Sequence, residues 1–401
     1  MAGILSGVTV VDLTQNVAGP YCTQLLGDLG AEVIKIERPG TGDDTRGWYP
    51  PKWGDESSVF AALNRNKKSI CIDLDQPEGQ EIVRKLCEKA DVFLHSLKPG
   101  SAESRGLGYE DLAQRNPKLI YAAISAFGDI GPMKHKPGYD PLIQAYTGII
   151  SVTGNPGDDP VRVGVSIIDM TTGMWALIGI LSALYRRKET GQGGRVGASL
   201  LETGVGWVNL PLASFLASGK LPQKMGTGTG MAAPYEAFRT KNEGEWVIIA
   251  AGNNRLFKSM CDALGMPELI EDPRFSTNPL RVQHRFELKK IIEERTTNYE
   301  MDELVRLLSE YKVPCSPINT LDRVVKDEQV EALEIIEKVD NDRIEDFRIV
   351  GLPFRIDGQR GEFRSMPPVL GEHTEEILKS LHYPDEEIRS LHERKIVQLR
   401  A

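Results

Sequence analysis

The sequence predicts an α/β protein in which helices cover both faces of a parallel sheet, together with a second and smaller domain. Strand-like and helix-like segments alternate from the N-terminus to residue 128, which is typical of a parallel sheet. The composition changes after residue 222, where a glycine-rich stretch and amphipathic helices begin. The length of 401 residues also exceeds that of most single domains.

The first half of the chain alternates between apolar strands and amphipathic helices. Runs of β-branched and apolar residues predict strands over 7–14, 32–40, 68–75, 91–97 and 119–128. The spacing of apolar residues predicts helices over 19–31 and 78–90. One long helix, "TTGMWALIGILSALYRRKETGQGG", follows and ends in a basic turn and glycine. This order favours successive βαβ units that build one sheet.

The second half has a different character. The glycine-rich stretch "QKMGTGTGMAAPY" precedes a predicted strand over 245–252 and predicted helices over 282–296 and 301–311. We therefore predict three segments. Residues 1–222 form the first part of a large α/β domain, 223–329 form the small domain, and 330–401 return to the large domain or bridge the two.

Composition and charge exclude several classes of protein. The net charge of −9 and pI near 5.4 argue against nucleic-acid binding. The five cysteines are scattered and the six histidines do not cluster, so neither a disulfide framework nor a metal site is expected. The N-terminus does not resemble a secretory signal, and the longest apolar run is too short for a membrane span. These features predict a cytoplasmic location with no membrane partner.

The opening segment "VVDLTQNVAGPYCTQLLGDLGAEVIKIE" imitates a dinucleotide-binding unit. The Gly-x-Gly-x-x-Gly turn is missing, because Gln15, Asn16 and Val17 stand where the first glycines belong. Without that turn an NAD or FAD site is disfavoured. The segment is better interpreted as a plain βαβ unit whose first loop contacts another ligand.

Basic residues near the predicted carboxyl ends of strands are candidates for holding phosphates. Most surface Lys and Arg side chains are simply solvated. Ligands of open α/β sheets, however, bind outside the carboxyl ends of the strands. Arg38 and the Ser96–Lys98 loop fall there, so they are the preferred candidates.

Asp169 is the one charged residue in the apolar stretch "GVSIIDMTTGM". An Asp just before a helix most often caps it by accepting a backbone N–H hydrogen bond. The same helix end would favour an ionised carboxylate, which could act as a nucleophile in an apolar site. The local pattern favours the cap and does not separate the two interpretations.

At this point the chain resembles the class III CoA-transferases, the formyl-CoA transferase and carnitine CoA-transferase type. The opening "LSGVTVVDLTQNVAGPYCTQLLGDLGAEVIKIERPGTGDDTR" is similar to the first block of the family. The later blocks follow in the family's order: "NRNKKSICIDL", "KPG…GLGYEDL", "GYDPLIQAYTG", "VGVSIIDMTTG" and "PPVLGEHTEEIL". The resemblance therefore covers nearly the whole chain.

The resemblance implies that Asp169 is the catalytic nucleophile. Its carboxylate would form an aspartyl anhydride and then an aspartyl-CoA thioester, before a carboxylic acid accepts the CoA. Gly226, Gly228 and Gly230 would lie over the site and help stabilise oxyanions. Coenzyme A enters as a substrate, and no permanently bound cofactor is expected. The implied CoA contacts are Val17, Ala18, Arg38, Ser96, Leu97, Lys98, Arg105, Tyr139 and Asp140.

The same resemblance implies a fold and an assembly. It implies a large Rossmann-like parallel-sheet domain built from both chain ends plus a small α+β domain, with two subunits interlocked in a homodimer. The blocks "GDDTRGWYPP", "NRNKKSI" and "AAGNN" look most similar to the branch that uses succinyl-CoA with dicarboxylates such as glutarate.

Two other functions stay open at this stage. Acyl-CoA racemases belong to the same superfamily, but they need a His and a Glu where this chain has Tyr139 and Asn253. Neither Tyr nor Asn has a pKa suited to abstracting an α-proton near neutrality. The second alternative is a non-catalytic CoA-binding protein in which Asp169 is only a helix cap.

Overall fold

The computed structural model describes residues 3–400, which divide into two compact units. The first unit comprises the chain up to Gly148, Val163–Leu210 and the chain from Ala332 onward. The second unit comprises Ile149–Arg162 and Pro211–Glu331. The sequence-based domain limits at 222 and 330 stay a prediction.

The first unit is built on a seven-stranded sheet with the order β14-β5-β2-β1-β6-β7-β8. Only the C-terminal β14 is antiparallel to its neighbour, with Val397 opposite Ile72. The six parallel strands, counted along the chain, have the order 3-2-1-4-5-6 of a doubly wound Rossmann sheet. The strands are β1 (Thr9–Leu13), β2 (Glu32–Glu37), β5 (Lys67–Ile72), β6 (Val92–His95), β7 (Ile120–Ser125), β8 (Gly194–Ser199) and β14 (Val397–Gln398).

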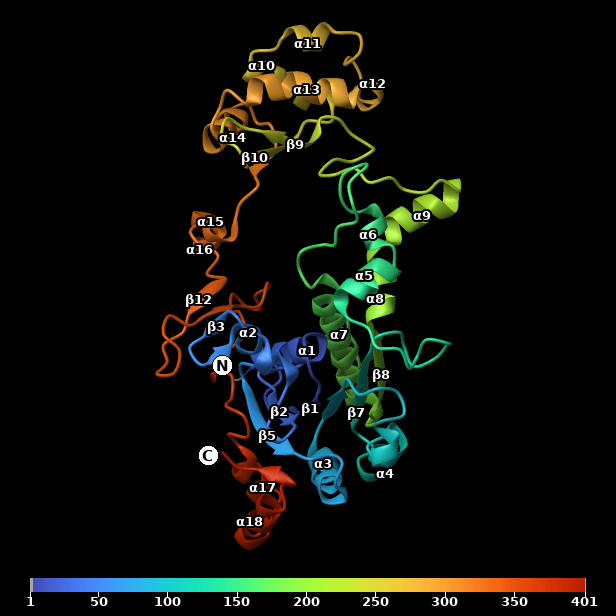
Figure 1. The fold of residues 1–401 in the computed structure, drawn as a ribbon, viewed down its shortest axis with the longest axis vertical. Coiled ribbons are helices and arrows are strands. Elements are labelled where there is room, and N and C mark those ends of the chain that lie inside the picture. The colour runs from blue at the N-terminus through green and yellow to red at the C-terminus, as the bar shows by residue number, and fades with distance from the viewer. Residues whose placement is uncertain (1–2, 401) are drawn as a thin grey trace. The chain divides into compact units, whose positions relative to one another are not determined.

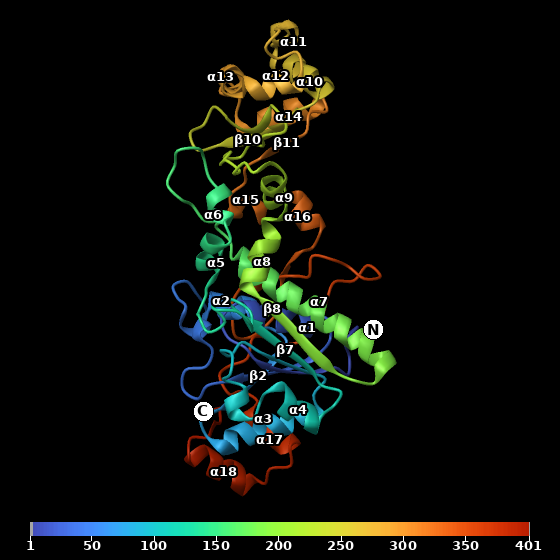
Figure 2. The same ribbon diagram turned by 90° about the vertical axis from the view of Figure 1, so that its right-hand side faces the viewer.

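Helices cover both faces of this sheet. Figure 2 shows α1 and α7 on one side and α3, α4 and α17 on the other. The helices of this unit are α1 (Ala18–Asp28), α2 (Ser58–Leu63), α3 (Pro77–Lys89), α4 (Tyr109–Arg115), α5 (Asp140–Tyr146), α7 (Ile167–Thr190), α8 (Leu200–Trp207), α17 (Thr374–Ser380) and α18 (Asp385–Glu393). The short pairs β3 (Lys52–Trp53) with β4 (Glu56–Ser57) and β12 (Ile336–Lys338) with β13 (Arg348–Val350) complete it.

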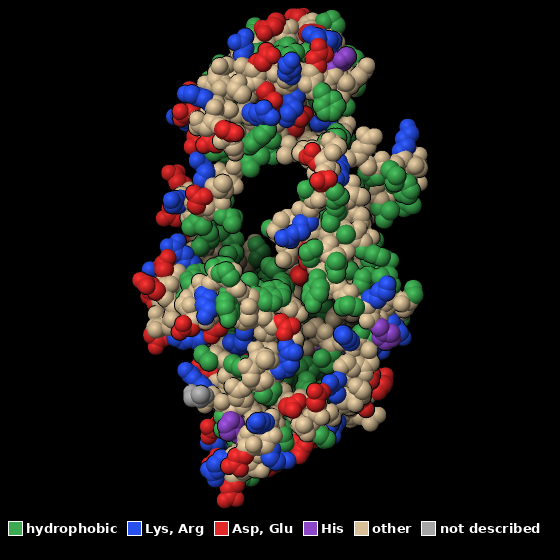
Figure 3. Space-filling model, viewed as in Figure 1, with side chains coloured by type: hydrophobic (Ala, Val, Ile, Leu, Met, Phe, Trp, Pro, Cys, Tyr) green, Lys and Arg blue, Asp and Glu red, His purple; other side chains and the backbone are tan. Residues whose placement is uncertain are grey.

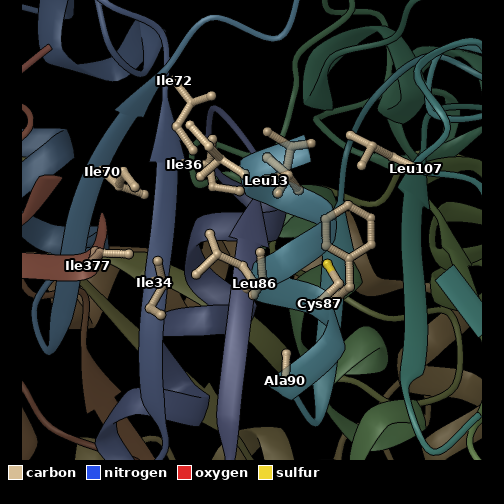
Figure 4. Close-up of a cluster of buried hydrophobic side chains, with 14 of the residues drawn as sticks. Leu13, Ile34, Ile36, Ile70, Ile72, Leu86, Cys87, Ala90, Leu107 and Ile377 are labelled. Carbon is tan, nitrogen blue, oxygen red and sulfur yellow. The ribbon is translucent and has the colours of Figure 1, made fainter. Parts of the chain in front are cut away.

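The core of the first unit explains why these segments fold as they do. The central strands are rich in β-branched apolar residues, and nearly all of their residues are buried on both faces of the sheet. Helix α3 buries Ile82, Val83, Leu86 and Cys87 at helical spacing. Figure 4 shows Leu86 and Cys87 among the strand side chains, beside Leu13. A sheet buried in this way fixes the loops at its carboxyl edge.

The second unit is a small α+β arrangement. Its antiparallel sheet has the order β11-β10-β9, from β9 (Tyr235–Arg239), β10 (Trp246–Ala250) and β11 (Cys315–Pro317). Its elements labelled in Figure 1 include α10, α13 and α14. The remaining helices of the chain are α6 (Ile149–Val152), α9 (Asn209–Ser218), α10 (Asn254–Leu264), α11 (Glu268–Glu271), α12 (Asn278–Gln283), α13 (Arg285–Thr296), α14 (Met301–Glu310), α15 (Leu321–Val324) and α16 (Glu328–Ala332).

The predicted fold class is confirmed: the chain is α/β with a large parallel-sheet core. One predicted element is wrong in detail, because the helix expected over 282–296 is interrupted at His284 between α12 and α13. The fully buried Arg281 donates to the carbonyl oxygens of Ala233, Gly252 and Phe275. These long-range bonds hold the end of α12, and apolar periodicity does not reveal them.

Helix α7 is long and apolar enough to meet the length and composition criteria for a membrane span. It packs against α1, β7 and β8, and it buries Ile168, Ala176, Leu177 and Ile180. These contacts are those of a core helix. The cytoplasmic location stays a prediction.

Candidate active site

A cavity of the first unit lies at the switch point of the sheet, where the strand order reverses between β1 and β6. The loops after these two strands line it together with Trp48, the segment before α5, and Asp169 on α7. The empty space measures about 980 Å³, part of which is open to solvent. This is the place where open α/β sheets bind their ligands.

The N-terminus of α1 supplies free backbone donors to this cavity. Val17 is the N-cap residue of α1, and its side chain caps nothing. Within residues 3–400, the N–H groups of Val17, Ala18 and Gly19 donate to no protein acceptor, and all three residues line the cavity. A helix N-terminus with unpaired N–H groups attracts negative charge. The cavity therefore suits an anionic group or a developing oxyanion.

Asp169 lines the same cavity but does not cap its helix. Helix α7 begins at Ile167, with Ser166 as the N-cap residue, so Asp169 is the third helical residue. The cap interpretation is therefore wrong. In the part of the chain that the structure describes, no group donates a hydrogen bond to the Asp169 carboxylate, which leaves it available for chemistry.

Asp140 takes the role of the cap. Its carboxylate accepts the backbone N–H of Ile168 at 2.7 Å and of Asp169 at 3.2 Å, and Gln144 Nε2 donates to it at 2.6 Å. Its side chain is buried and does not line the cavity. The carboxylate that accepts the otherwise unpaired N–H groups at the N-terminus of α7 thus comes from α5.

Burial raises the pKa of Asp169 to about 7, and the nearby negative charge of Asp140 adds to the shift. The sequence suggested that the helix N-terminus keeps Asp169 ionised. That effect is worth about 0.3–1 kcal/mol, which is less than one pKa unit. Desolvation is the larger effect here, and Asp169 titrates near neutral pH.

Seven residues singled out from the sequence come together at this cavity: Val17, Ala18, Ser96, Leu97, Lys98, Tyr139 and Asp169. Lys98 is exposed at its edge, as a side chain that binds phosphate would be. The other predicted residues lie elsewhere. Arg38 is exposed and ion-paired with Asp44, and Arg105 is ion-paired with Asp75, so neither lines this cavity.

The predicted glycine loop belongs to the second unit. Gly226 has a φ of 60°, and Gly228 lies so close to Arg285 that a Cβ would fall 2.3 Å from Nη2. Gly226 therefore favours glycine for its backbone conformation, and a side chain at Gly228 would displace the Arg285 guanidinium. The prediction that Gly226, Gly228 and Gly230 lie over Asp169 stays a prediction.

Sequence reasoning missed two parts of the cavity wall. One is Trp48, an aromatic side chain with 42% exposure. The other is the basic stretch Lys134–Lys136 before α5. Two features of the sequence could have indicated them. Trp48 is an aromatic residue in the Gly- and Pro-rich "RGWYPP", and the two lysines stand close together in "MKHKPGYD".

Metal ligands and cysteine thiols are two further kinds of group that could react. Within residues 3–400, no group of three or more His, Cys, Asp or Glu side chains is arranged to hold a metal ion. Cys22, Cys71 and Cys87 are buried free thiols, and burial raises the pKa of each. A thiolate is the reactive form of cysteine, so these residues are poor nucleophiles.

The fold and this cavity define an α/β protein in which a free carboxylate and helix-end amides share one ligand-sized cavity. Comparison with known proteins is more specific. The family model described as "CoA-transferase family III" matches residues 5–374, and the chain belongs to this family. It is therefore a CoA-transferase, an enzyme whose substrates are CoA thioesters.

Relatives agree with this assignment. The chain is 40% identical to a succinyl-CoA:glutarate CoA-transferase from Mus musculus, over 95% of this chain and 87% of the relative. It is 36% identical to a succinyl-CoA–D-citramalate CoA-transferase from Chloroflexus aurantiacus, over 94% of each. A crystal structure of a CaiB/BaiF family protein from Brucella suis matches with a TM-score of 0.87 and 37% identity, covering 95% of this chain and 100% of that one.

Proposed function

We propose that this CoA-transferase moves CoA from succinyl-CoA to a dicarboxylic acid through covalent intermediates on Asp169. One observation carries the mechanism: the Asp169 carboxylate has no hydrogen-bond partner among residues 3–400 and shares a cavity with the free N–H groups of Val17–Gly19. The names of relatives that act on glutarate and D-citramalate support a dicarboxylate as the acceptor.

The first half of the reaction transfers CoA to the enzyme. The Asp169 carboxylate attacks the thioester carbonyl, and the N–H groups at the start of α1 stabilise the tetrahedral oxyanion. The C–S bond breaks, which gives a mixed anhydride of Asp169 and succinate together with the CoA thiolate. The thiolate attacks the Asp169 acyl carbon, succinate leaves, and Asp169 carries CoA as a thioester.

The second half repeats these steps with the acceptor. The acceptor carboxylate attacks the Asp169 thioester, which expels the CoA thiolate and forms a second anhydride. The thiolate then attacks the acyl carbon of the acceptor. The new acyl-CoA leaves, and the Asp169 carboxylate is restored without any net gain or loss of protons.

We propose that CoA contacts two groups of residues, one near its thioester and one near its phosphates. The Ser96–Lys98 loop and Tyr139 line the cavity, so they are suited to contact the pantetheine arm near the thioester. Arg38 and Arg105 are the proposed contacts for the phosphates. Each would exchange its present carboxylate partner for a phosphate, which forms the same kind of charge-assisted hydrogen bond with a guanidinium.

We also propose that the enzyme is an interlocked homodimer. The first unit exposes large apolar side chains that a monomer would leave in water. Figure 3 shows hydrophobic side chains on the surface over α5 and α8. The exposed large apolar residues on α5, α7 and α8 are Leu142, Tyr146, Met174, Trp175, Ile178, Tyr185, Val205 and Trp207.

The racemase alternative is less well supported. Asn253 accepts the backbone N–H of Leu256 at 2.9 Å and caps α10, so its side chain is engaged in the fold. Tyr139 takes the place of the His that the racemases need, and its side chain is 57% exposed.

Trapping of the covalent intermediate tests the proposed function. The protein is incubated with succinyl-CoA, then treated with hydroxylamine or borohydride and digested for mass spectrometry. We expect modification at Asp169 in the wild type and none in Asp169→Asn, which also loses turnover. An active Asn variant, or exchange of the α-proton without CoA transfer, would refute the mechanism.

A panel of acyl-CoA donors and mono- and dicarboxylate acceptors then identifies the substrates.

A further inference from the structure

The turn between β1 and α1 is held by side chains from other parts of the first unit. The carbonyl oxygen of Thr14 accepts from Lys35 Nζ at 2.9 Å. The N–H of Gln15 donates to Ser96 Oγ at 3.1 Å, and the N–H of Asn16 donates to Asp43 Oδ1 at 3.2 Å. Three successive residues thus have a backbone group tied to a distant side chain.

Two of these side chains form a buried ion pair. Lys35 Nζ lies 2.8 Å from Asp43 Oδ2, and both side chains are completely buried. Burial alone would lower the pKa of Lys35, but Asp43, Asp12 and Glu37 outweigh it and raise this pKa. Burial opposes the charge of Asp43 too, yet Lys35 and the groups of Thr45 lower its pKa. Both members of the pair are therefore charged at neutral pH.

The pair acts on a backbone that needs support. Asn16 has a φ of 68°, in the left-handed region that residues other than glycine seldom adopt, although asparagine adopts it more readily than most. The hydrogen bond from its N–H to Asp43 compensates for part of that cost. Neither Lys35 nor Asp43 lines the cavity. Any effect on the reaction must pass through the turn to the residues that follow it.

We propose that the Lys35–Asp43 pair positions the catalytic amides: it holds the Thr14–Asn16 turn so that the N–H groups of Val17–Gly19 meet the oxyanion formed beside Asp169. The inference rests on the proposed function, because it assigns these N–H groups to the oxyanion. Lys35 and Asp43 are positioning residues, since neither touches the substrate. Displacing a catalytic donor by about 1 Å can cost about 100-fold in rate, so a remote pair can govern turnover.

If the Lys35–Asp43 pair served only stability, its variants would behave differently. Replacing a buried ion pair with uncharged side chains often costs little stability, whereas removing one partner leaves an unpaired buried charge. The test therefore compares Lys35→Met with the double variant Lys35→Met/Asp43→Asn, which removes both charges. If only stability matters, the double variant regains wild-type turnover along with its folding stability.

We expect kcat for CoA transfer to fall about 10- to 100-fold in both variants, while KM for the acyl-CoA changes by less than about threefold. The matched control is Arg65→Met. It breaks a buried ion pair, with 2.6 Å between Arg65 Nη2 and Asp28 Oδ2, at the opposite end of α1. The control should lower the melting temperature but keep kcat within about twofold of the wild type.

Amide hydrogen exchange provides a readout that does not depend on CoA transfer. A peptide covering residues 14–19 should exchange faster in Lys35→Met than in the wild type, and at an unchanged rate in Arg65→Met. If the wild type transfers no CoA, the proposed function fails while the exchange result still tests the turn.

Three results would overturn the positioning role. They are wild-type kcat in Lys35→Met or the double variant, a loss no larger than in Arg65→Met, and unchanged exchange of the 14–19 peptide. If Lys35→Met does not fold, Asp43→Asn takes its place. That substitution conserves the side-chain volume and can keep an oxygen acceptor for Asn16 in the position of Oδ1. It removes the charge and places an amide NH2 where Oδ2 faces Lys35.

Discussion

At the scale of single residues, the ionisation of Asp169 couples chemistry to pH. The nucleophile must be a carboxylate, and burial raises the pKa of Asp169 to about 7. We therefore expect kcat/KM for CoA transfer to rise with pH and to level off above an apparent pKa near 7. Initial rates between pH 5.5 and 8.5 measure this profile. A flat profile across that range would contradict the assignment.

The same pKa shift predicts a stability effect. A carboxyl group whose pKa is raised on folding stabilises the folded state at low pH, and this stabilisation is lost as the pH rises through 7. Asp169→Asn removes the cost of burying the charge. The variant should melt at a higher temperature than the wild type at pH 8 and at a similar temperature at pH 4. Calorimetry at the two pH values gives the comparison.

Asp140 should influence the nucleophile through charge. Asp140→Asn keeps an oxygen for the N–H groups of Ile168 and Asp169, but it removes the negative charge that raises the pKa of Asp169. We expect the rise of the pH–rate profile to move to lower pH. Asp111→Asn on the exposed surface of α4 is the control and should leave the profile in place. An unmoved profile in Asp140→Asn would show that burial alone sets the pKa.

At the scale of elements, the close contact of α1 and α7 brings the amides and the carboxylate to one cavity. A Cβ on Gly173 of α7 would lie 2.5 Å from the carbonyl oxygen of Ala18 on α1. Gly173→Ala must push these helices apart. We expect a loss of about 1–3 kcal/mol in the free energy of unfolding and a lower kcat. Urea titration and turnover measure the two effects.

Gly206 in α8 provides the matched control for that substitution. A Cβ there would meet no atom within 4 Å. Replacing a helical glycine with alanine in open space usually stabilises by about 0.5–1 kcal/mol. Gly206→Ala should therefore gain stability and keep its turnover. If Gly173→Ala and Gly206→Ala change stability and kcat equally, the contact between α1 and α7 does not explain the effect of Gly173→Ala.

Some of these elements could be predicted from sequence, and the reasons are physical. Strands such as β1 and β2 are rich in β-branched apolar residues, so their composition reveals them, although β2 also buries Lys35 and Glu37. The helix cap was mispredicted because the acceptor for Ile168 N is Asp140, 28 residues earlier in the chain. Local patterns carry no information about such a partner. The local pattern singles out Asp169, and the resemblance of the neighbouring blocks favours the nucleophile over the cap.

At the scale of the whole molecule, the first unit uses both ends of the chain. Val397 of β14 is buried and pairs with Ile72, so the last residues finish the sheet that the first strands begin. A chain that leaves the first unit after Leu210 and returns at Ala332 passes through the second unit in between. The interlocked homodimer that the family resemblance implies is proposed for a chain with this connectivity.

An interlocked dimer predicts an unusual response to dilution. Subunits that are threaded through each other cannot separate while folded, so the dimer should persist at nanomolar concentration. A dimer held only by surface contact would dissociate as mass action requires. Sedimentation velocity across a thousandfold dilution distinguishes the two assemblies. Trp175→Glu sharpens the test, because it places a charge on the exposed apolar face of α7. The variant should melt at a lower temperature yet remain a dimer, whereas dissociation into folded monomers would refute interlocking.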